Sequence, residues 1–243
     1  MLLFLEVIMN AKHLIWTYFS PTERTLWFGS SVLILLSFCL FDREQYLTLL
    51  ASLIGVTSLI FSAKGNPIGQ LLMVLFSLLY GIISFTCSYY GEMITYLGMT
   101  MPMAVFALIS WLRHPYQGNK AEVQVNQISR REQMYMWLAT VLVTVLFCFI
   151  LAFFHTANLL PSTLSVTTSF VAVYLTFRRS PWYAVAYAAN DLILILLWVL
   201  ASLEDIRYFS VAICFAAFFV NDLYGFVCWR SMEKRQTAGL TAN

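Results

Sequence analysis

Eight apolar segments, each close to the length of a membrane-spanning helix, follow one another along the chain. A helix needs about 20 predominantly apolar residues to cross the hydrocarbon core of a bilayer. Of the 243 residues, 60% are hydrophobic and only 11% are charged, whereas a soluble domain carries about 25% charged residues. We therefore predict an all-α integral membrane protein with eight transmembrane helices. The predicted helices are residues 24–41, 46–63, 68–88, 92–111, 134–154, 163–177, 182–203 and 208–229.

Several predicted helices begin with residues that favour helix initiation. Ser20-Pro21-Thr22-Glu23 is a capping box with proline at the first helical position, and Asn66-Pro67 and Ser180-Pro181 place proline behind a capping residue. Pro102 falls inside the fourth segment, where its missing N–H predicts a kink. Residues 1–22 lack the pattern of a signal peptide, and we predict that they form a helix lying on the membrane surface.

Lysine and arginine are distributed unequally between the two sides that eight crossings define. One side holds Lys12, Arg24, Lys64, Arg113, Lys120, Arg130, Arg131, Arg178, Arg179, Arg230, Lys234 and Arg235, and the other holds Arg43 and Arg207. Because loops rich in Lys and Arg stay in the cytoplasm, both termini are predicted to be cytoplasmic. The protein would then be a multi-pass membrane protein.

Two segments of the chain resemble each other in their order of features. Residues 46–113 and 163–230 each contain a helix, a short basic loop ending in proline, a second helix, a short acidic loop and a third helix. Three helices end on the side opposite to where they began, so a second copy in the same orientation needs one more crossing, supplied by 134–154. We predict parallel three-helix repeats in a 3+1+3 arrangement, preceded by one extra helix at 23–42 and followed by a cytoplasmic tail at 231–243. Such repeats place substrate sites near the midplane.

Two Asn-Asp-Leu triplets lie inside the last two apolar segments, beginning at Asn190 and at Asn221. A carboxylate at the bilayer centre costs roughly 2.5–3.5 kcal/mol, so Asp191 and Asp222 indicate a polar site or a set of interhelical contacts. Asp191 is ten residues past Pro181, or about 15 Å along a helix, which is the midplane. Asp222 is shallower, and its role stays open between ligand contact, gate and helix pairing.

Polar and aromatic side chains at helical spacing line the predicted inner faces of the helices. The candidate substrate-binding residues are Trp182, Tyr183, Tyr187, Asn190, Asp191, Trp198, Asn221, Asp222, Tyr224, Gln70, Ser77, Tyr80 and Thr100. Aromatic faces stack on rings and attract cations, and amides bind hydroxyl and carboxamide groups. These groups suit a neutral or cationic small molecule with a flat ring. Trp111 and Trp229, near helix ends, are predicted to belong to the aromatic belts at the membrane surface.

No pattern in the sequence predicts an enzyme, a cofactor or a metal site. The five cysteines lack metal-ligand spacing, and no H-E-x-x-H, G-x-S-x-G or P-loop motif occurs. The net charge of +2 gives no reason to expect nucleic acid as a partner. An integral-membrane lipid enzyme remains a remote alternative, because it would need a nucleophile and base or metal ligands near the membrane surface.

The chain resembles the PnuC family of nicotinamide riboside transporters over about residues 46–235. The resemblance rests on the 3+1+3 arrangement, on the aromatic run 182–190 ending in an intramembrane asparagine, and on a last helix ending in an N-x-Y-G-x-x-x-W-like run. That run is 222–229 here, with Asp222 where the family pattern has asparagine.

Membership would imply a SWEET-like fold, a homotrimer, and uptake of nicotinamide riboside by facilitated diffusion with trapping by cytoplasmic phosphorylation. Thiamine and riboflavin, the substrates of sister groups, and a proton-coupled mechanism using Asp191 or Asp222 remain alternatives. In the expected site the substrate ring would stack on Trp182 or a nearby tyrosine, and Asn190 and Gln70 would bind its carboxamide or ribose.

Overall fold

The computed structural model describes residues 17–86, 89–156 and 158–241. The helices are α2 (Pro21–Phe41), α3 (Tyr46–Ala63), α4 (Ile68–Thr86), α5 (Tyr90–Thr95), the π-helical turn η1 (Tyr96–Thr100), α6 (Met101–Arg113), α7 (Arg130–Phe153), α8 (Leu159–Phe177), α9 (Tyr183–Ser202), the 3-10 turn η2 (Ile206–Tyr208) and α10 (Phe209–Thr241). Within the described residues, eight helical segments are long and apolar enough to cross a membrane, which confirms the predicted number. Most of the predicted surface helix at 1–22 lies outside the described residues.

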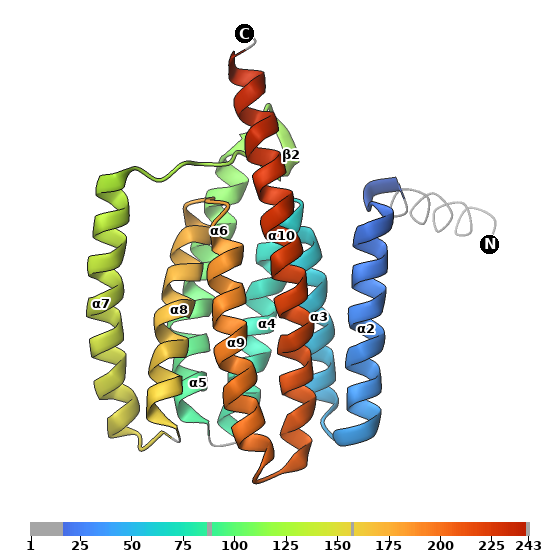
Figure 1. The fold of residues 1–243 in the computed structure, drawn as a ribbon, viewed down its shortest axis with the longest axis vertical. Helices are drawn as coiled ribbons and strands as arrows, with labels where there is room; N and C mark the ends of the chain where they lie inside the picture. The colour runs from blue at the N-terminus through green and yellow to red at the C-terminus, as the bar shows by residue number, and fades with distance from the viewer. Residues whose placement is uncertain (1–16, 87–88, 157, 242–243) are drawn as a thin grey trace, which may run out of the picture.

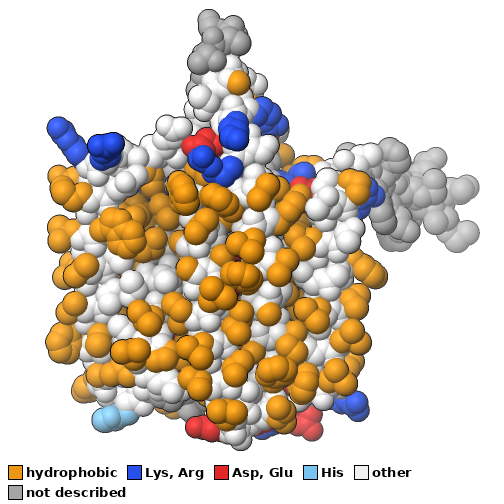
Figure 2. All heavy atoms as spheres, in the orientation of Figure 1, with side chains coloured by type: hydrophobic (Ala, Val, Ile, Leu, Met, Phe, Trp, Pro, Cys, Tyr) orange, Lys and Arg blue, Asp and Glu red, His pale blue; other side chains and the backbone are white. Residues whose placement is uncertain are grey.

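The long helices stand side by side in one bundle, with α7 at one edge and α2 at the opposite edge (Figure 1). Apolar side chains form a belt around the visible side of the bundle, and most of the visible Lys and Arg side chains gather at one end (Figure 2). We call this end, which holds the loops 64–67 and 178–181 and the C-terminal part of α10, the basic face. The extended α10 projects beyond the belt at the basic face (Figure 1).

The two three-helix segments contact each other through their outer helices. Helix α3 packs against α4 and α10, and α8 packs against α9 and α6. The first helix of each three-helix segment therefore contacts the third helix of the other segment. This matched pattern supports two repeats joined by α7, which packs mainly on α8. Most of α7 faces outward: Leu138, Leu142 and Phe149 are 68%, 70% and 72% exposed.

Trp111 and Trp229 make the same contact in the two halves of the bundle. Trp111 Nε1 donates to the Thr176 carbonyl at 2.9 Å, and Trp229 Nε1 donates to the Ser62 carbonyl at 2.8 Å. Both rings are buried, with their centroids 5.3 Å apart. The prediction that they belong to the aromatic belts is wrong, because the crossing of α10 over α3 and of α6 over α8 carries both rings into the interior.

The turns after α3 and α8 have the same backbone geometry. Gly65 and Arg179 both adopt the left-handed conformation, with φ of 67° and 57°. The following N–H groups close the helix ends, from Asn66 to the Phe61 carbonyl and from Ser180 to the Leu175 carbonyl, at 3.0 Å each. Such a 6→1 bond is the signature of the Schellman motif. The equal geometry places both prolines, Pro67 and Pro181, just before the next helix.

Residues 114–129, which we call the strap, run across the basic face. The strap contains a two-stranded antiparallel hairpin, β1 (Pro115–Tyr116) and β2 (Asn119–Val123), which the all-α prediction missed. Val123 N donates to the Gly65 carbonyl at 2.9 Å, and Asn126 N donates to the Arg179 carbonyl at 3.0 Å. The strap therefore holds the equivalent turns of both halves together.

The C-terminal part of α10 supports the strap. The predicted separate tail at 231–243 is helical through Thr241 and continues α10 without a break. Gln236, 4% exposed, accepts from Val125 N at 2.8 Å and donates to the Glu122 side chain at 2.9 Å and to the Val123 carbonyl at 3.1 Å. One amide side chain thus satisfies three groups of the strap.

Replacing Gln236 with alanine is expected to weaken the strap by about 1–3 kcal/mol, because it leaves backbone groups of Val123 and Val125 without partners. Hydrogen–deuterium exchange of a peptide covering residues 119–128 should become faster. Thr237→Ala is the matched control, since the Thr237 hydroxyl bonds the Glu233 carbonyl of its own helix. Equal exchange in Gln236→Ala and in the parent would show that the amide does not hold the strap.

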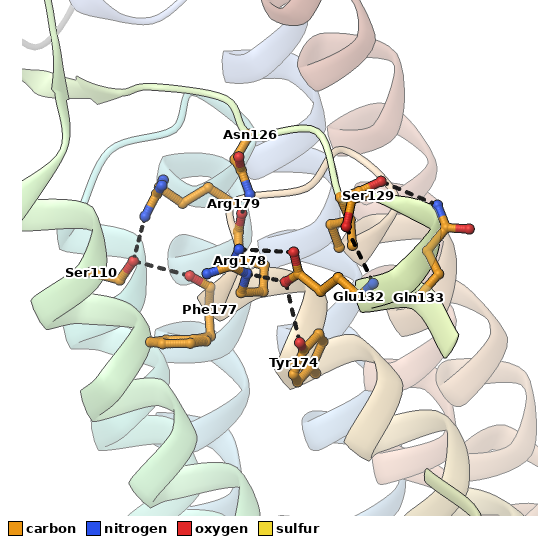
Figure 3. A network of polar contacts seen from close by, with 10 residues as sticks. Ser110, Asn126, Ser129, Glu132, Gln133, Tyr174, Phe177, Arg178 and Arg179 are labelled. Atoms are coloured by element: carbon orange, nitrogen blue, oxygen red, sulfur yellow. Dashed lines mark hydrogen bonds and ion pairs between the residues drawn. The ribbon is translucent and has the colours of Figure 1, made fainter. Parts of the chain in front are cut away.

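Polar contacts at the basic face also tie α7 to α8. Glu132 on α7 accepts from Arg178 Nη2 at 2.9 Å and from the Tyr174 hydroxyl at 3.2 Å (Figure 3). Arg179 reaches in the other direction, and its Nη1 donates to Ser110 Oγ at 2.7 Å (Figure 3). The turn after α8 is therefore fixed from both sides.

Pro102 follows a local change of helix type. The chain runs without a break from α5 through the π-helical turn η1 into α6, and Pro102 lies in the first turn of α6. A π-turn accommodates one extra residue and is a recognised cause of helix kinks. The turn carries Tyr96 and Thr100, both buried, toward the interior.

Candidate functional site

One face of α9 supplies most of the polar interior. Tyr183, Asn190, Asp191 and Trp198 are each 2–3% exposed, and intervals of seven to eight residues, about two helical turns, align Tyr183, Asn190-Asp191 and Trp198 along one side of the helix. From the basic face inward, the order is Tyr183, Tyr187, Asn190-Asp191 and Trp198. The acidic residue therefore lies between an aromatic pair on one side and a tryptophan on the other.

Asp191 on α9 and Asp222 on α10 both lie buried where these two helices pack together. Both residues are 3% exposed, and their side chains are close enough to interact electrostatically. No N–H or hydroxyl group in the described part of the chain donates to Asp191 Oδ2. Buried polar atoms are normally satisfied, so an exception at the middle of a bundle points to a functional position.

Further unpartnered hydroxyls lie on the helices that face α9. Ser77 Oγ on α4 and Thr100 Oγ1 in η1 are buried without a hydrogen-bond partner among the described residues. Ser77 is one turn from Tyr80, and Thr100 is one turn from Tyr96. The rings of Tyr80 and Tyr96 are in contact, at 4.3 Å between centroids, and Tyr96 is close enough to Asp191 for the two to interact electrostatically. We call Ser77, Thr100, Tyr187, Asn190, Asp191 and Asp222 the central polar cluster.

Aromatic rings lie on both sides of the central polar cluster. Toward the basic face, Trp229 packs on Trp111 at 5.3 Å and on Tyr183 at 4.9 Å. Toward the opposite face, Trp198 Nε1 donates to the Tyr80 hydroxyl at 2.6 Å, and its ring packs on Tyr89 at 5.2 Å. The cluster is therefore enclosed between two aromatic layers.

A small cavity lies between α3, α4 and α10. It is bounded by Phe76, Tyr80 and Cys214 and measures about 10 Å³, which is close to the space that one water molecule occupies. Its lining includes no residue of the central polar cluster.

Asn190 binds the neighbouring helix α8 through its side-chain carbonyl. Its Oδ1 accepts from Thr168 Oγ1 at 2.9 Å, from Ser169 Oγ at 3.0 Å and from Ser165 Oγ at 3.4 Å. This set of bonds fixes the orientation of the amide between α8 and α9. The interhelical role that the sequence left open for Asn190 is thus present in the structure.

Four of the predicted site residues lie away from the central polar cluster. Asn221 donates to Ser30 Oγ on α2 at 2.9 Å, and Tyr224 hydrogen-bonds Ser20 at the start of α2. Gln70 Nε2 donates to Ser62 Oγ at 3.3 Å, beside the Trp229 contact at the basic end. Trp182 is 53% exposed and packs on Phe226 outside the core. These four residues therefore make contacts between helices or at the edge of the bundle, and they do not contribute to the central polar cluster.

Trp182 borders a large pocket at the edge of the bundle. The pocket measures about 630 Å³ and opens among α7, α8, α9 and the strap; its lining includes Met136, Trp137, Val171, Val185 and Ala189. Most of its walls are apolar, and the residues that line it include neither Asp191 nor Asp222. It is therefore distinct from the central polar cluster.

Glu92 and Tyr96 were not among the predicted site residues. Glu92 was predicted to lie in the short acidic loop of the first repeat, but α5 begins at Tyr90 and Glu92 is 4% exposed, with Oε2 unpartnered among the described residues. Tyr96 shares the helical spacing of Thr100, and this periodicity is the sequence signal for its inward position. No group of three or more His, Cys, Asp or Glu in the described segments is arranged to hold a metal ion.

Comparison with known proteins decides the family. The family profile described as "Nicotinamide mononucleotide transporter" matches residues 45–231, which is more than half of the chain. The chain belongs to this family, the PnuC transporters. It is 23% identical over 228 residues to the nicotinamide riboside transporter PnuC of Neisseria mucosa, covering 91% of this chain and 84% of that protein.

The fold is also that of a solved PnuC structure. The crystal structure of the vitamin B3 transporter PnuC superposes with a TM-score of 0.77 at 21% identity, covering 90% of this chain and 94% of that one. The chain is therefore a multi-pass membrane protein of the PnuC family, and the central polar cluster lies within the matched residues.

Proposed function

We propose that this PnuC-family protein transports nicotinamide riboside and binds it at the central polar cluster. Nicotinamide riboside combines a cationic pyridinium ring with a carboxamide and ribose hydroxyls. The observation that carries the proposal is the composition of the cluster. It contains two carboxyl groups, Asp191 and Asp222, while every Lys and Arg among the described residues lies in a loop, near a helix end or in the extension of α10.

The description of the family profile names nicotinamide mononucleotide, and that of the relative names nicotinamide riboside. The same observation distinguishes these two ligands. Nicotinamide mononucleotide differs from the riboside by a phosphate, which carries about −1.5 to −2 charges at neutral pH. No Lys or Arg of the described segments lies at the depth of Asp191 to pair with the phosphate, and the two carboxyl groups offer it no positive charge. The geometry therefore favours the riboside over the mononucleotide.

In the proposed complex, the hydroxyls of Ser77 and Thr100 bind ribose or carboxamide groups. The aromatic layers open alternately, which gives access from one side at a time, and transport is facilitated diffusion followed by phosphorylation of the substrate inside the cell. The basic face is cytoplasmic, in keeping with the distribution of Lys and Arg, and the membrane is a bacterial inner membrane. The homotrimer is proposed from the resemblance to the family.

Titration calorimetry of the purified protein tests the choice of substrate. Nicotinamide riboside is expected to bind at least tenfold more tightly than nicotinamide mononucleotide, a difference of about 1.4 kcal/mol or more. Thiamine and riboflavin serve as controls for the sister substrates. Tighter binding of the mononucleotide, or of either vitamin, would contradict the proposal.

Proton-coupled transport is the second candidate, favoured by the burial of Asp191 and Asp222 inside the bundle. Buried acidic residues in transporters often carry a proton. Uptake into liposomes with and without an imposed proton gradient separates the two mechanisms. Accumulation only with the gradient would favour coupling, whereas equilibration independent of the gradient supports facilitated diffusion.

A further inference from the structure

The pocket at the edge of the bundle, which we call the edge pocket, lies where two helices leave room for it. Helix α7 packs on α8, and α8 packs on α9, but within the described residues α7 and α9 make no extensive contact with each other. The edge pocket measures about 630 Å³, and Ala186 and Ala189 form part of its wall on α9. Trp137 and Val185 line it and remain exposed. The pocket is therefore open to the side of the bundle, where the lipid lies.

The edge pocket extends from the basic face into the apolar belt. Its lining includes Ile128 of the strap and Pro181 at the basic face, and it reaches Ala189 on α9. Ala189 is six residues after Tyr183, the first residue of α9, or about 9 Å along the helix. An acyl chain of one leaflet reaches from the membrane surface to the midplane, about 15 Å. The pocket therefore accompanies more than half of that length.

The hydroxyls deep in the edge pocket are already bonded within the protein. Thr167 Oγ1 is 2.9 Å from Thr144 Oγ1, and Thr168 Oγ1 donates to Asn190 Oδ1 at 2.9 Å. In the part of the chain that the structure describes, no residue lining the pocket has a buried side-chain nitrogen or oxygen without a partner. Burying a polar group without a hydrogen bond is costly, so the pocket suits a hydrocarbon chain better than a polar solute.

A second hollow at the basic face adjoins the edge pocket. It measures about 460 Å³, and we call it the basic hollow. Its lining residues are Gln127, Arg230, Glu233, Lys234, Thr237 and Ala238. Gln127 and Glu233 also line the edge pocket. The guanidinium of Arg230 lies over the ring of Trp182, 5.9 Å from its centroid, and Trp182 lines the edge pocket. The two hollows are therefore neighbouring parts of one groove.

Positive charge exceeds negative charge around the basic hollow. Arg230 pairs with Glu233, but no acidic group among the described residues pairs with Lys234. Arg130 is one helical turn before Gln133, which lines the edge pocket, so it lies on the same face of α7. An anionic group in the basic hollow would therefore meet more cations than carboxylates.

We propose that the edge pocket and the basic hollow together bind an anionic phospholipid, with an acyl chain between α7 and α9 and the phosphate beside Lys234 and Arg230. The hydrocarbon chain needs an apolar pocket open to the bilayer, and the phosphate needs cations at the membrane surface. Basic pockets between transmembrane helices bind anionic lipid headgroups in this way. The site is separate from the central polar cluster, so the proposal does not depend on which substrate the protein transports.

Native mass spectrometry of the full-length protein in detergent measures lipid binding directly. Phosphatidylglycerol, which is anionic, is compared with phosphatidylcholine of the same acyl chains, which is zwitterionic. The parent is expected to bind phosphatidylglycerol at least fivefold more tightly. Lys234→Gln with Arg130→Gln should bring the two affinities within twofold of each other, because each Lys or Arg near an anionic lipid changes binding roughly fivefold. Both side chains are exposed, so this variant should keep its fold.

Lys120→Gln is the matched control for charge, because Lys120 is an exposed cation of the strap that lines neither hollow. It should keep the full preference for phosphatidylglycerol.

Ala189→Trp tests the apolar part of the site, because the added ring fills the edge pocket. Binding of both lipids should fall at least fivefold. Leu142→Trp, on the outward side of α7 and not part of the pocket lining, is its control and should bind as the parent does. Thermal unfolding identifies the folded variants, and Val185→Trp fills the same pocket if Ala189→Trp does not fold.

Four results would overturn the proposal. Equal affinities of the parent for the two lipids would remove the role of the cations. Unchanged lipid binding in the folded pocket-filling variants would place the lipid elsewhere on the apolar belt. A parent that binds no lipid, together with a loss of its oligomers in Ala189→Trp, would assign the groove to a second copy of the chain. Displacement of the bound lipid by nicotinamide riboside would assign the groove to the substrate.

Discussion

Replacing Trp229 with alanine is expected to lower the free energy of unfolding by about 3–5 kcal/mol, the usual cost of truncating a buried tryptophan. The ring is 0% exposed, it packs on Trp111 and Tyr183, and its Nε1 donates to the Ser62 carbonyl at 2.8 Å. The change removes the contact between α10 and the end of α3 and leaves a cavity. For a chain of this size the midpoint of thermal unfolding should fall by about 6–20 °C.

Matched tryptophan variants identify the cause of that loss. Trp111→Ala should destabilise the protein by a similar amount, because Trp111 makes the equivalent bond to Thr176. Trp137→Ala, on the outward side of α7 and 56% exposed, should change the midpoint by far less. Equal effects of Trp229→Ala and Trp137→Ala, measured by thermal unfolding in the same detergent, would contradict a structural role for the buried pair.

The number and positions of the spanning helices could be predicted because apolar length alone decides them. The burial of Trp111 and Trp229 could not be predicted from the sequence. A tryptophan near a helix end has the same local sequence whether it lies in a belt at the membrane surface or at a crossing between helices. Which one applies depends on the packing of α10 on α3 and of α6 on α8. The hairpin of the strap was missed for a similar reason: its strands are short, and the end of β2 at Val123 is held by Gln236 of α10.

The polar face of α9 could be predicted from the spacing of its residues, because this spacing does not depend on which helices pack around α9. The two acidic triplets differ because adjacent residues on a helix point about 100° apart. Packing against α2 turns Asn221 toward Ser30, and this leaves Asp222 facing Asp191. The sequence contains both residues, but only the position of α2 decides which of them faces the interior.

Removing the unpartnered hydroxyls of Ser77 and Thr100 is expected to weaken substrate binding without weakening the fold. In Ser77→Ala with Thr100→Val, the shapes of the side chains are nearly kept, and no protein hydrogen bond is lost among the described residues, since neither hydroxyl has a partner. A buried polar group without a partner costs stability, so the midpoint of thermal unfolding should stay equal or rise. Two lost ligand hydrogen bonds, at about 0.5–1.5 kcal/mol each, predict affinity reduced roughly 5- to 150-fold.

Trp182→Ala provides the contrast for this variant. Trp182 borders the pocket at the edge of the bundle and is 53% exposed, so its loss should leave binding at the central polar cluster nearly unchanged. Strong weakening by Trp182→Ala would instead favour the peripheral pocket as the substrate site. The two variants therefore distinguish the two locations within one fold.

Calorimetric titration of nicotinamide riboside into the parent, the Ser77→Ala with Thr100→Val variant and Trp182→Ala tests the central claim most directly. We predict that the hydroxyl-deficient variant remains folded and binds at least fivefold more weakly, and that Trp182→Ala binds within twofold of the parent. Unchanged affinity in the hydroxyl-deficient variant, together with lost affinity in Trp182→Ala, would contradict a substrate site between α4, η1 and α9.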